Sequence, residues 1–201
     1  MLARHAGVEA VRLARREAEA EVLRSRATAL PPGAGLEEAR GCFVSLHRGG
    51  ELRGCVGFAE PVRPLREALR EAARGAVRDP RFEPVRPREL DALTVEVSVL
   101  GLPVPVRAAD PLRLPESLRI GEHGLLLQAG RRRALLLPQV ALEQGLTPEA
   151  FLAACCAKAG LDPDAWRKDG LRWHVFGSQV FREAAPRGEV RAHEEERPEV
   201  A

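Results

Sequence analysis

Tyrosine is absent from this 201-residue chain, and aromatic residues of all kinds make up only 4% of it. Proteins that bind single-stranded nucleic acid stack the bases on aromatic side chains, so no such platform is expected. Lysine is also scarce, since Lys158 and Lys168 are the only two, and the net charge is +2. A protein that attracts nucleic acid through a broad positive field needs a larger excess of charge. The composition therefore argues against nucleic acid as a partner.

Several common functional motifs are missing. The four cysteines form no Cys-x-x-Cys pair and have no cysteine–histidine spacing typical of zinc sites, so no metal is expected. There is no phosphate-binding P-loop, no dinucleotide fingerprint and no Gly-x-Ser-x-Gly elbow, so no nucleotide cofactor is expected either. No apolar run is long enough for a signal peptide core or a membrane span. We expect a cytoplasmic protein without a membrane anchor, in a compartment that keeps its thiols reduced.

The order of apolar periods predicts an α+β fold, because a hairpin followed by a helix occurs twice without strict strand–helix alternation. Helices are predicted at 5–26, from Pro64 onward and from Pro148 to the glycine at 160. Residues from 184 to 201 are polar and charged, and we expect a frayed tail there. The predicted strands are 41–47, 51–58, 93–100, 118–123, 125–128, 133–137 and 171–181.

The most unusual stretch is 51–58, which alternates like a strand but contains two glycines. Strict alternation would place Arg53 and Cys55 on the same face. A guanidinium near a thiol favours the thiolate, which is the nucleophilic form of cysteine. The alternative is that Cys55 is a small buried hydrophobic residue. The pattern alone leaves both interpretations open.

The preceding Gly49-Gly50 pair predicts a tight two-residue turn. With a regular ladder beyond that turn, Val44 would face Cys55, and Cys42 would lie diagonal to Cys55 on the same face. A disulfide between these two cysteines would then be geometrically feasible, although a reducing compartment disfavours it.

Seven stretches in this order and spacing resemble the AMMECR family over roughly residues 8–183, and Leu52-Arg53-Gly54-Cys55-Val56-Gly57 is the most specific of them. The resemblance implies two subdomains, one larger and one smaller, around a curved, mostly antiparallel sheet with flanking helices. It places a single domain at 1–183 and the tail at 184–201. Prokaryotic members, of the AmmeMemoRadiSam system protein A type, imply a Memo-like protein and a radical-SAM protein as partners. The stretches are 43–46, 52–57, 79–82, 95–100, 121–125, 136–140 and 156–161.

The matched motifs suggest a site in a cleft between the two subdomains. Cys55 would be the nucleophile, and His123 or Glu96 would move the proton, since such groups meet in space and not in sequence order. This hypothesis makes the chain a cysteine-dependent enzyme that acts on a small molecule or peptide. The residues expected to bind the substrate are Arg53, Gly54, Ser98 and Gln139.

The rival interpretation is a non-catalytic binding or adaptor module. The same residues would then surround a small ligand or a partner's peptide, and glycines would allow close backbone approach. A third interpretation, metal binding by Cys55, Glu96 and His123, has weak support because the sequence offers no close pair of ligands.

Overall fold

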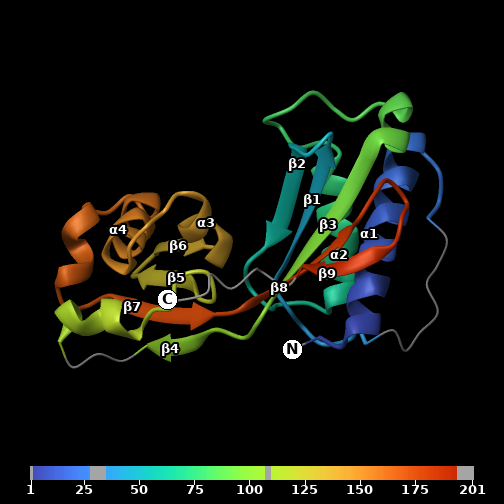
Figure 1. Cartoon of the computed structure of the whole chain (residues 1–201). Helices are drawn as coiled ribbons and strands as arrows, with labels where there is room; N and C mark the ends of the chain where they lie inside the picture. The colour runs from blue at the N-terminus through green and yellow to red at the C-terminus, as the bar shows by residue number, and fades with distance from the viewer. Residues whose placement is uncertain (1, 28–34, 107–109, 194–201) are drawn as a thin grey trace, which may run out of the picture. The chain divides into compact units, whose positions relative to one another are not determined.

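The computed structural model of the chain describes residues 2–27, 35–106 and 110–193. The chain divides into two compact units, the first made of Met1–Leu100 with Gln179–Ala201 and the second of Gly101–Ser178. The second unit is therefore an insertion within the first. The expected α+β class is confirmed, and the strands form two antiparallel sheets (Figure 1). Among the described residues, no helix combines the length and apolar character needed to cross a membrane.

The first unit contains a five-stranded sheet in the order β2-β1-β3-β8-β9. The predicted hairpin and the strand at 93–100 form as expected, with Arg48 opposite Glu51 at the turn. The elements are α1 (Arg4–Leu23), β1 (Cys42–Arg48), β2 (Glu51–Phe58), α2 (Leu65–Ala76), the 3-10 helix η1 (Pro87–Ala92), β3 (Leu93–Leu100), β8 (Ser178–Glu183) and β9 (Val190–His193).

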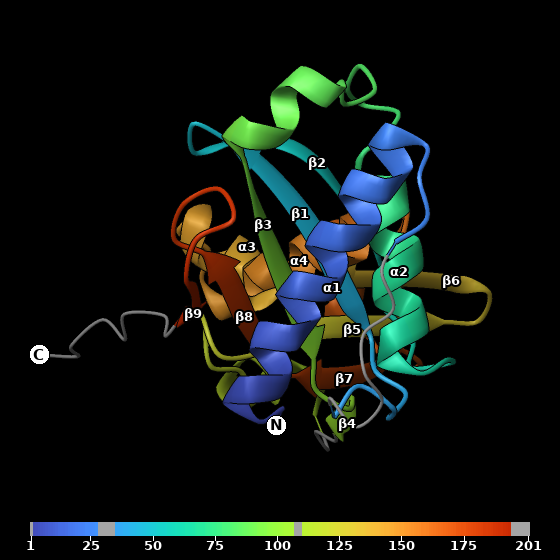
Figure 2. The same cartoon turned by 90° about the vertical axis from the view of Figure 1, so that its right-hand side faces the viewer.

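Both long helices of the first unit pack on one face of this sheet (Figure 2). Alternation along β1 and β3 sends Val44 and Val97 into the shared core, where both are fully buried. In α2, apolar residues recur at helical spacing, and small ones such as Ala68 and Ala72 let the helix approach the strands closely. The sheet face that points away from α1 and α2 therefore carries polar side chains of β1 and β3, such as Ser45 and Glu96.

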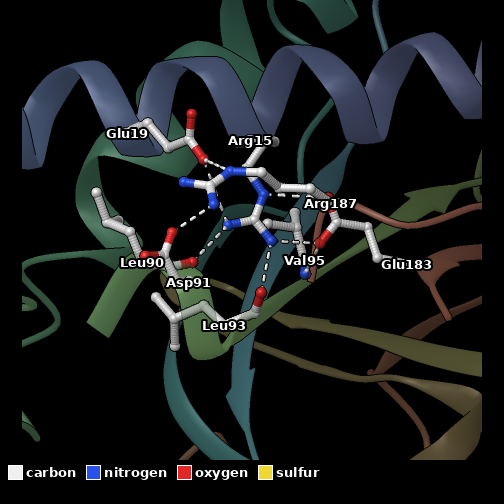
Figure 3. Close-up of polar contacts among 8 residues, drawn as sticks. All are labelled: Arg15, Glu19, Leu90, Asp91, Leu93, Val95, Glu183 and Arg187. Atoms are coloured by element: carbon white, nitrogen blue, oxygen red, sulfur yellow. Dashed lines mark hydrogen bonds and ion pairs between the residues drawn. The ribbon is translucent and has the colours of Figure 1, made fainter. Parts of the chain in front are cut away.

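A buried ion pair joins the beginning of the first unit to its end (Figure 3). The guanidinium of Arg15 on α1 donates to both carboxylate oxygens of Glu183 on β8, with an Nε–Oε1 distance of 3.0 Å. It also donates to the carbonyls of Leu90 and Leu93, while the Val95 amide donates to Glu183 at 3.0 Å. Each charge thus has several partners, as burial requires. The outer part of the cluster consists of Glu19, Asp91 and Arg187.

The second unit contains a four-stranded sheet in the order β4-β7-β5-β6, with a separate apolar core that includes Phe151 and Trp173. The predicted helix start at Thr147-Pro148 is confirmed, because the Thr147 hydroxyl accepts a bond from the Ala150 amide. The elements are β4 (Val104–Val106), the 3-10 helix η2 (Pro111–Ser117), β5 (Gly124–Ala129), β6 (Arg132–Leu136), α3 (Pro138–Glu143), α4 (Pro148–Lys158), the 3-10 helix η3 (Pro163–Arg167) and β7 (Arg172–Phe176).

Two predicted strands are wrong. Residues 118–123 form a turn, in which the amides of Glu122 and His123 both donate to the Arg119 carbonyl and Gly121 adopts a positive φ of 84°. The predicted strand 171–181 is two strands, β7 and β8, which belong to different sheets and are separated by Gly177. A continuous apolar pattern carries no signal for a change of sheet.

The expectation of a frayed tail from residue 184 is also wrong in part. Residues Val190–His193 form β9, which pairs antiparallel with β8. Backbone pairing does not need an apolar run, and here Val190 packs against the core. Residues 194–201 lie outside the described part of the chain.

Candidate functional site

Cys55 lies on β2, at the edge of the five-stranded sheet, between two glycines that are required by packing. A Cβ atom at Gly54 would lie 2.2 Å from the carbonyl oxygen of Ala76, where α2 ends. A Cβ atom at Gly57 would lie 2.3 Å from the carbonyl oxygen of Cys42 on β1. The two glycines therefore let β2 approach its neighbours closely, and Gly54 has a structural role in addition to any role in binding.

The register of the hairpin differs from the predicted one. Cys55 is opposite Ser45, not Val44, because the ladder shifts between Leu46 and His47. Arg53 is the extra residue of this bulge, so the strict alternation that placed it with Cys55 does not hold there.

This register puts the two cysteines of the hairpin on opposite faces of the sheet. Cys42 is fully buried on the helix side, where burial raises the pKa of its thiol to about 12. Cys55 lies on the other face and is half-buried, and both thiols are free. The inference that a disulfide between them is geometrically feasible is therefore wrong, because it assumed a regular ladder.

The backbone of Cys55 is held by Asp79 and Arg81 from the loop after α2. The Cys55 amide donates to Asp79 Oδ2 at 2.9 Å, and the Arg81 guanidinium donates to the Cys55 carbonyl at 3.2 Å. Arg81 also donates to both oxygens of Asp79. These bonds use the outward-facing polar groups of an edge strand that has no further strand beside it.

Asp79 is the anionic centre of this arrangement, with only 4% of its surface exposed. The hydrogen bond from Arg81 lowers the pKa of the Asp79 carboxyl well below its usual range, and the amides of Cys55 and Arg81 add to this. The sequence analysis assigned no role to Asp79 and did not predict its contact with Cys55. The signal was present, because the Asp-Pro-Arg-Phe stretch at 79–82 belongs to the matched motifs.

The thiol of Cys55 belongs to a row of polar side chains across three neighbouring strands. The Ser45 hydroxyl on β1 donates to Cys55 Sγ at 3.3 Å. On the other side of Ser45, its register partner on β3 is Glu96, whose carboxylate lies 4.0 Å from Arg182. Ser98 lies two residues further along β3 on the same face and is buried. The structure thus brings Cys55 and Glu96 to one face, with Ser45 between them.

Arg53 makes its contacts with a different carboxylate. Its guanidinium donates to Glu89 of η1 in a two-point pair, with distances of 3.0 and 3.3 Å. Burial opposes ionisation of Glu89, but the Arg86 amide and the Arg53 guanidinium outweigh it and lower the pKa of the Glu89 carboxyl. The guanidinium in contact with Cys55 is that of Arg81.

His123 and Gln139 lie in the second unit. His123 Nδ1 accepts a bond from the Arg119 amide at 3.2 Å, and burial together with the Arg119 charge lowers the pKa of the imidazole. Gln139, in the first turn of α3, donates to the Ser178 hydroxyl at 3.1 Å. Its Oε1 is buried and lacks a partner among the described residues.

No cluster of three or more histidine, cysteine, aspartate or glutamate side chains within 2–27, 35–106 and 110–193 has the arrangement of a metal site. The weak metal interpretation of Cys55, Glu96 and His123 gains no geometric support from these residues.

Comparisons with known proteins give one consistent result. The family model named AMMECR1 matches residues 11–181. A protein of Thermofilum pendens is 45% identical over 198 residues, covering 92% of each chain. Protein MJ0810 of Methanocaldococcus jannaschii is 48% identical over 156 residues, covering 76% of this chain and 78% of that protein. The crystal structure of the uncharacterized protein PH0010 from Pyrococcus horikoshii is similar with a TM-score of 0.87, at 39% identity, covering 95% of this chain and 98% of the other.

Proposed function

The chain belongs to the AMMECR1 family, and from that premise we propose that it is a cysteine-dependent enzyme with Cys55 as its nucleophile, acting on a small molecule or peptide. One observation carries the proposal: Cys55 is fixed at three points. Its amide is bound by Asp79, its carbonyl by Arg81 and its thiol by the Ser45 hydroxyl. Such fixed placement is what a nucleophile needs for attack in a defined direction.

The chemistry follows from the polar row on the same sheet face. The Ser45 hydroxyl that donates to Cys55 Sγ would stabilise the negative charge that the sulfur carries during attack, because a hydrogen bond to a charged acceptor is stronger. The thiolate would form a bond to an electrophilic carbon of the substrate as the bond to the leaving group breaks. Because Ser45 lies between Cys55 and Glu96, the thiol proton would reach the Glu96 carboxylate through the Ser45 hydroxyl and then pass to the leaving group. Water would then displace the sulfur and release the product. These roles use the first unit alone. The predicted role of His123 in proton transfer stays a proposal. The predicted roles in substrate binding also stay proposals, for Arg53, Gly54, Ser98 and Gln139.

The test is the alkylation rate of each cysteine with iodoacetamide at pH 7, read by peptide mass spectrometry on the unmodified chain. Cys42, Cys155 and Cys156 are buried and serve as slow internal references. We expect Cys55 to react faster than free cysteine. We expect Ser45→Ala to slow it about tenfold, since a hydrogen bond to a charged group contributes about 1.5 kcal/mol or more.

A matched control is Thr94→Val, which alters a polar residue on the same strand as Glu96 but opposite His47. It should leave the alkylation rate of Cys55 unchanged. A Cys55 that reacts no faster than free cysteine, and at the same rate in Ser45→Ala, would reject the nucleophile.

A non-catalytic adaptor is the second candidate, and a specific observation favours it. Charged residues of the matched motifs already have partners within the protein. Asp79 pairs with Arg81, and Arg53 pairs with Glu89. On this alternative, the motif stabilises a surface for a Memo-like or radical-SAM partner. Slow alkylation of Cys55 combined with retained capture of such a partner by Cys55→Ala would support it.

A further inference from the structure

A hollow of about 550 Å³ opens in the first unit beside the β1–β2 hairpin. The loop between α2 and η1 passes over the end of β1 and β2 at which the hairpin turns, and η1 follows this loop (Figure 1). The volume is within the range of sites for small molecules, about 300–1,000 Å³. Its lining consists of Arg48, Arg53, Phe82, Glu83, Pro84, Arg86, Arg88 and Glu89.

The charges of this arginine hollow do not cancel. Four guanidinium groups face two carboxylates, which leaves a net charge of +2. Glu89 is already engaged by Arg53, and Arg48 lies further from it, at 3.6 Å. Within the described part of the chain, Arg86 and Arg88 are exposed and have no carboxylate at ion-pair distance. Two positive charges thus line the hollow without an internal counterion.

The hollow also has an apolar wall, formed by Phe82 and Pro84. The Phe82 ring is half-buried, and the Arg81 guanidinium lies 5.6 Å from its centroid. Arg81 also donates hydrogen bonds to Asp79 and to the Cys55 carbonyl. These bonds connect this side of the hollow to β2 at Cys55. A ligand that fits would combine an anionic group with a flat or apolar part.

We propose that the arginine hollow is a binding site for a small organic phosphate. A phosphate monoester carries about two negative charges at neutral pH, which matches the excess of +2. Planar guanidinium groups bind phosphate oxygens through two parallel hydrogen bonds, and this is the preferred arginine chemistry for such anions. The organic part of the ligand lies against Phe82 and Pro84. Arg53, one of the residues expected to bind the substrate of Cys55, also lines the hollow, but phosphate binding here does not depend on the Cys55 thiol.

Isothermal titration calorimetry with phenyl phosphate tests the site, with inorganic phosphate and phenol as reference probes. We expect phenyl phosphate to bind at least about tenfold more tightly than inorganic phosphate, because only the ester also contacts the apolar wall. Phenol should not bind measurably. Equal affinity for the ester and for inorganic phosphate would overturn the assignment of an organic phosphate, and binding of phenol alone would overturn the role of the arginines.

The double variant Arg86→Ala/Arg88→Ala should raise the Kd for phenyl phosphate at least about tenfold. The charge-matched control Arg26→Ala/Arg131→Ala removes two exposed arginines elsewhere and should leave the Kd within about twofold. Similar losses in both double variants would show a general charge effect and overturn the site. Cys55→Ala should bind phenyl phosphate normally, so loss of thiol reactivity and loss of this site are separate results.

Discussion

Two groups of arginines and glutamates in the first unit differ in their burial and in their balance of charge. Around Arg15 and Glu183, both charges are buried and every donor has a nearby acceptor, including backbone carbonyls (Figure 3). In the arginine hollow, positive charge exceeds negative charge and Arg88 is exposed. The same residue types thus stabilise the fold in one place and leave charge available for a ligand in the other. What differs is burial and the ratio of the two signs.

The largest effect is expected at the buried group. Glu183→Gln removes the charge that compensates Arg15 and should lower the free energy of unfolding by about 3–5 kcal/mol, because an uncompensated charge stays buried. Urea unfolding followed by circular dichroism measures this. The control Glu189→Gln changes an exposed glutamate between β8 and β9 and should lower the free energy of unfolding by less than about 0.5 kcal/mol. Equal losses of unfolding free energy in the two variants would show that burial of the ion pair makes no difference to its contribution.

An intermediate effect is expected for Asp79, whose carboxylate is buried while its partner Arg81 is 59% exposed. Asp79→Asn weakens the bonds to Arg81 and to the Cys55 amide and should lower the free energy of unfolding by about 1–3 kcal/mol. The measurement is again urea unfolding at pH 7. A loss of unfolding free energy as large as that of Glu183→Gln would contradict the expectation that a more exposed ion pair contributes less to stability.

Asp79 also predicts a pH dependence. Its pKa is lowered in the folded chain, so its stabilisation is fully present above the unfolded value of about 3.9 and is lost as the pH falls toward the folded value. Between pH 5 and pH 3, wild-type stability should therefore decrease more steeply than that of Asp79→Asn. Parallel profiles would show that the Asp79 carboxylate contributes no linked stability.

The smallest effect on stability is expected in the hollow. Arg88→Ala removes an exposed side chain with no carboxylate partner among the described residues, so the free energy of unfolding should change by less than about 0.5 kcal/mol. Thermal unfolding without ligand measures this. The same variant should still weaken phenyl phosphate binding. A large loss of stability would mean that Arg88 is structural, like Arg15.

Local patterns in the sequence predicted much of the first unit. The strand at 93–100 agrees with β3 (Leu93–Leu100), because its alternation is regular and one face is buried. The bulge at Arg53 could not be predicted, since it depends on how β2 meets β1 and on the Ala76 carbonyl beside Gly54. One extra residue changed the partner of Cys55 from Val44 to Ser45.

Long-range partners account for most of the candidate site that sequence reasoning missed. Ser45 and Asp79 are polar residues of ordinary appearance, and only the fold places them on Cys55. The motif singled out Arg53 and Cys55 as site residues, yet the contact of Arg53 is Glu89, 36 residues further along the chain. Side chains that meet through tertiary structure leave no periodic trace in the sequence.

The insertion of the second unit has a consequence for the order of synthesis. Arg15 leaves the ribosome 168 residues before Glu183, and the inserted unit Gly101–Ser178 is made within that interval. At about 5–20 residues per second, this interval is roughly 10–30 s. Until the interval ends, the nascent first unit has a guanidinium without its carboxylate, and β1, β2 and β3, once made, lack β8 and β9. Translation of the inserted unit therefore sets the earliest moment at which the first unit is complete.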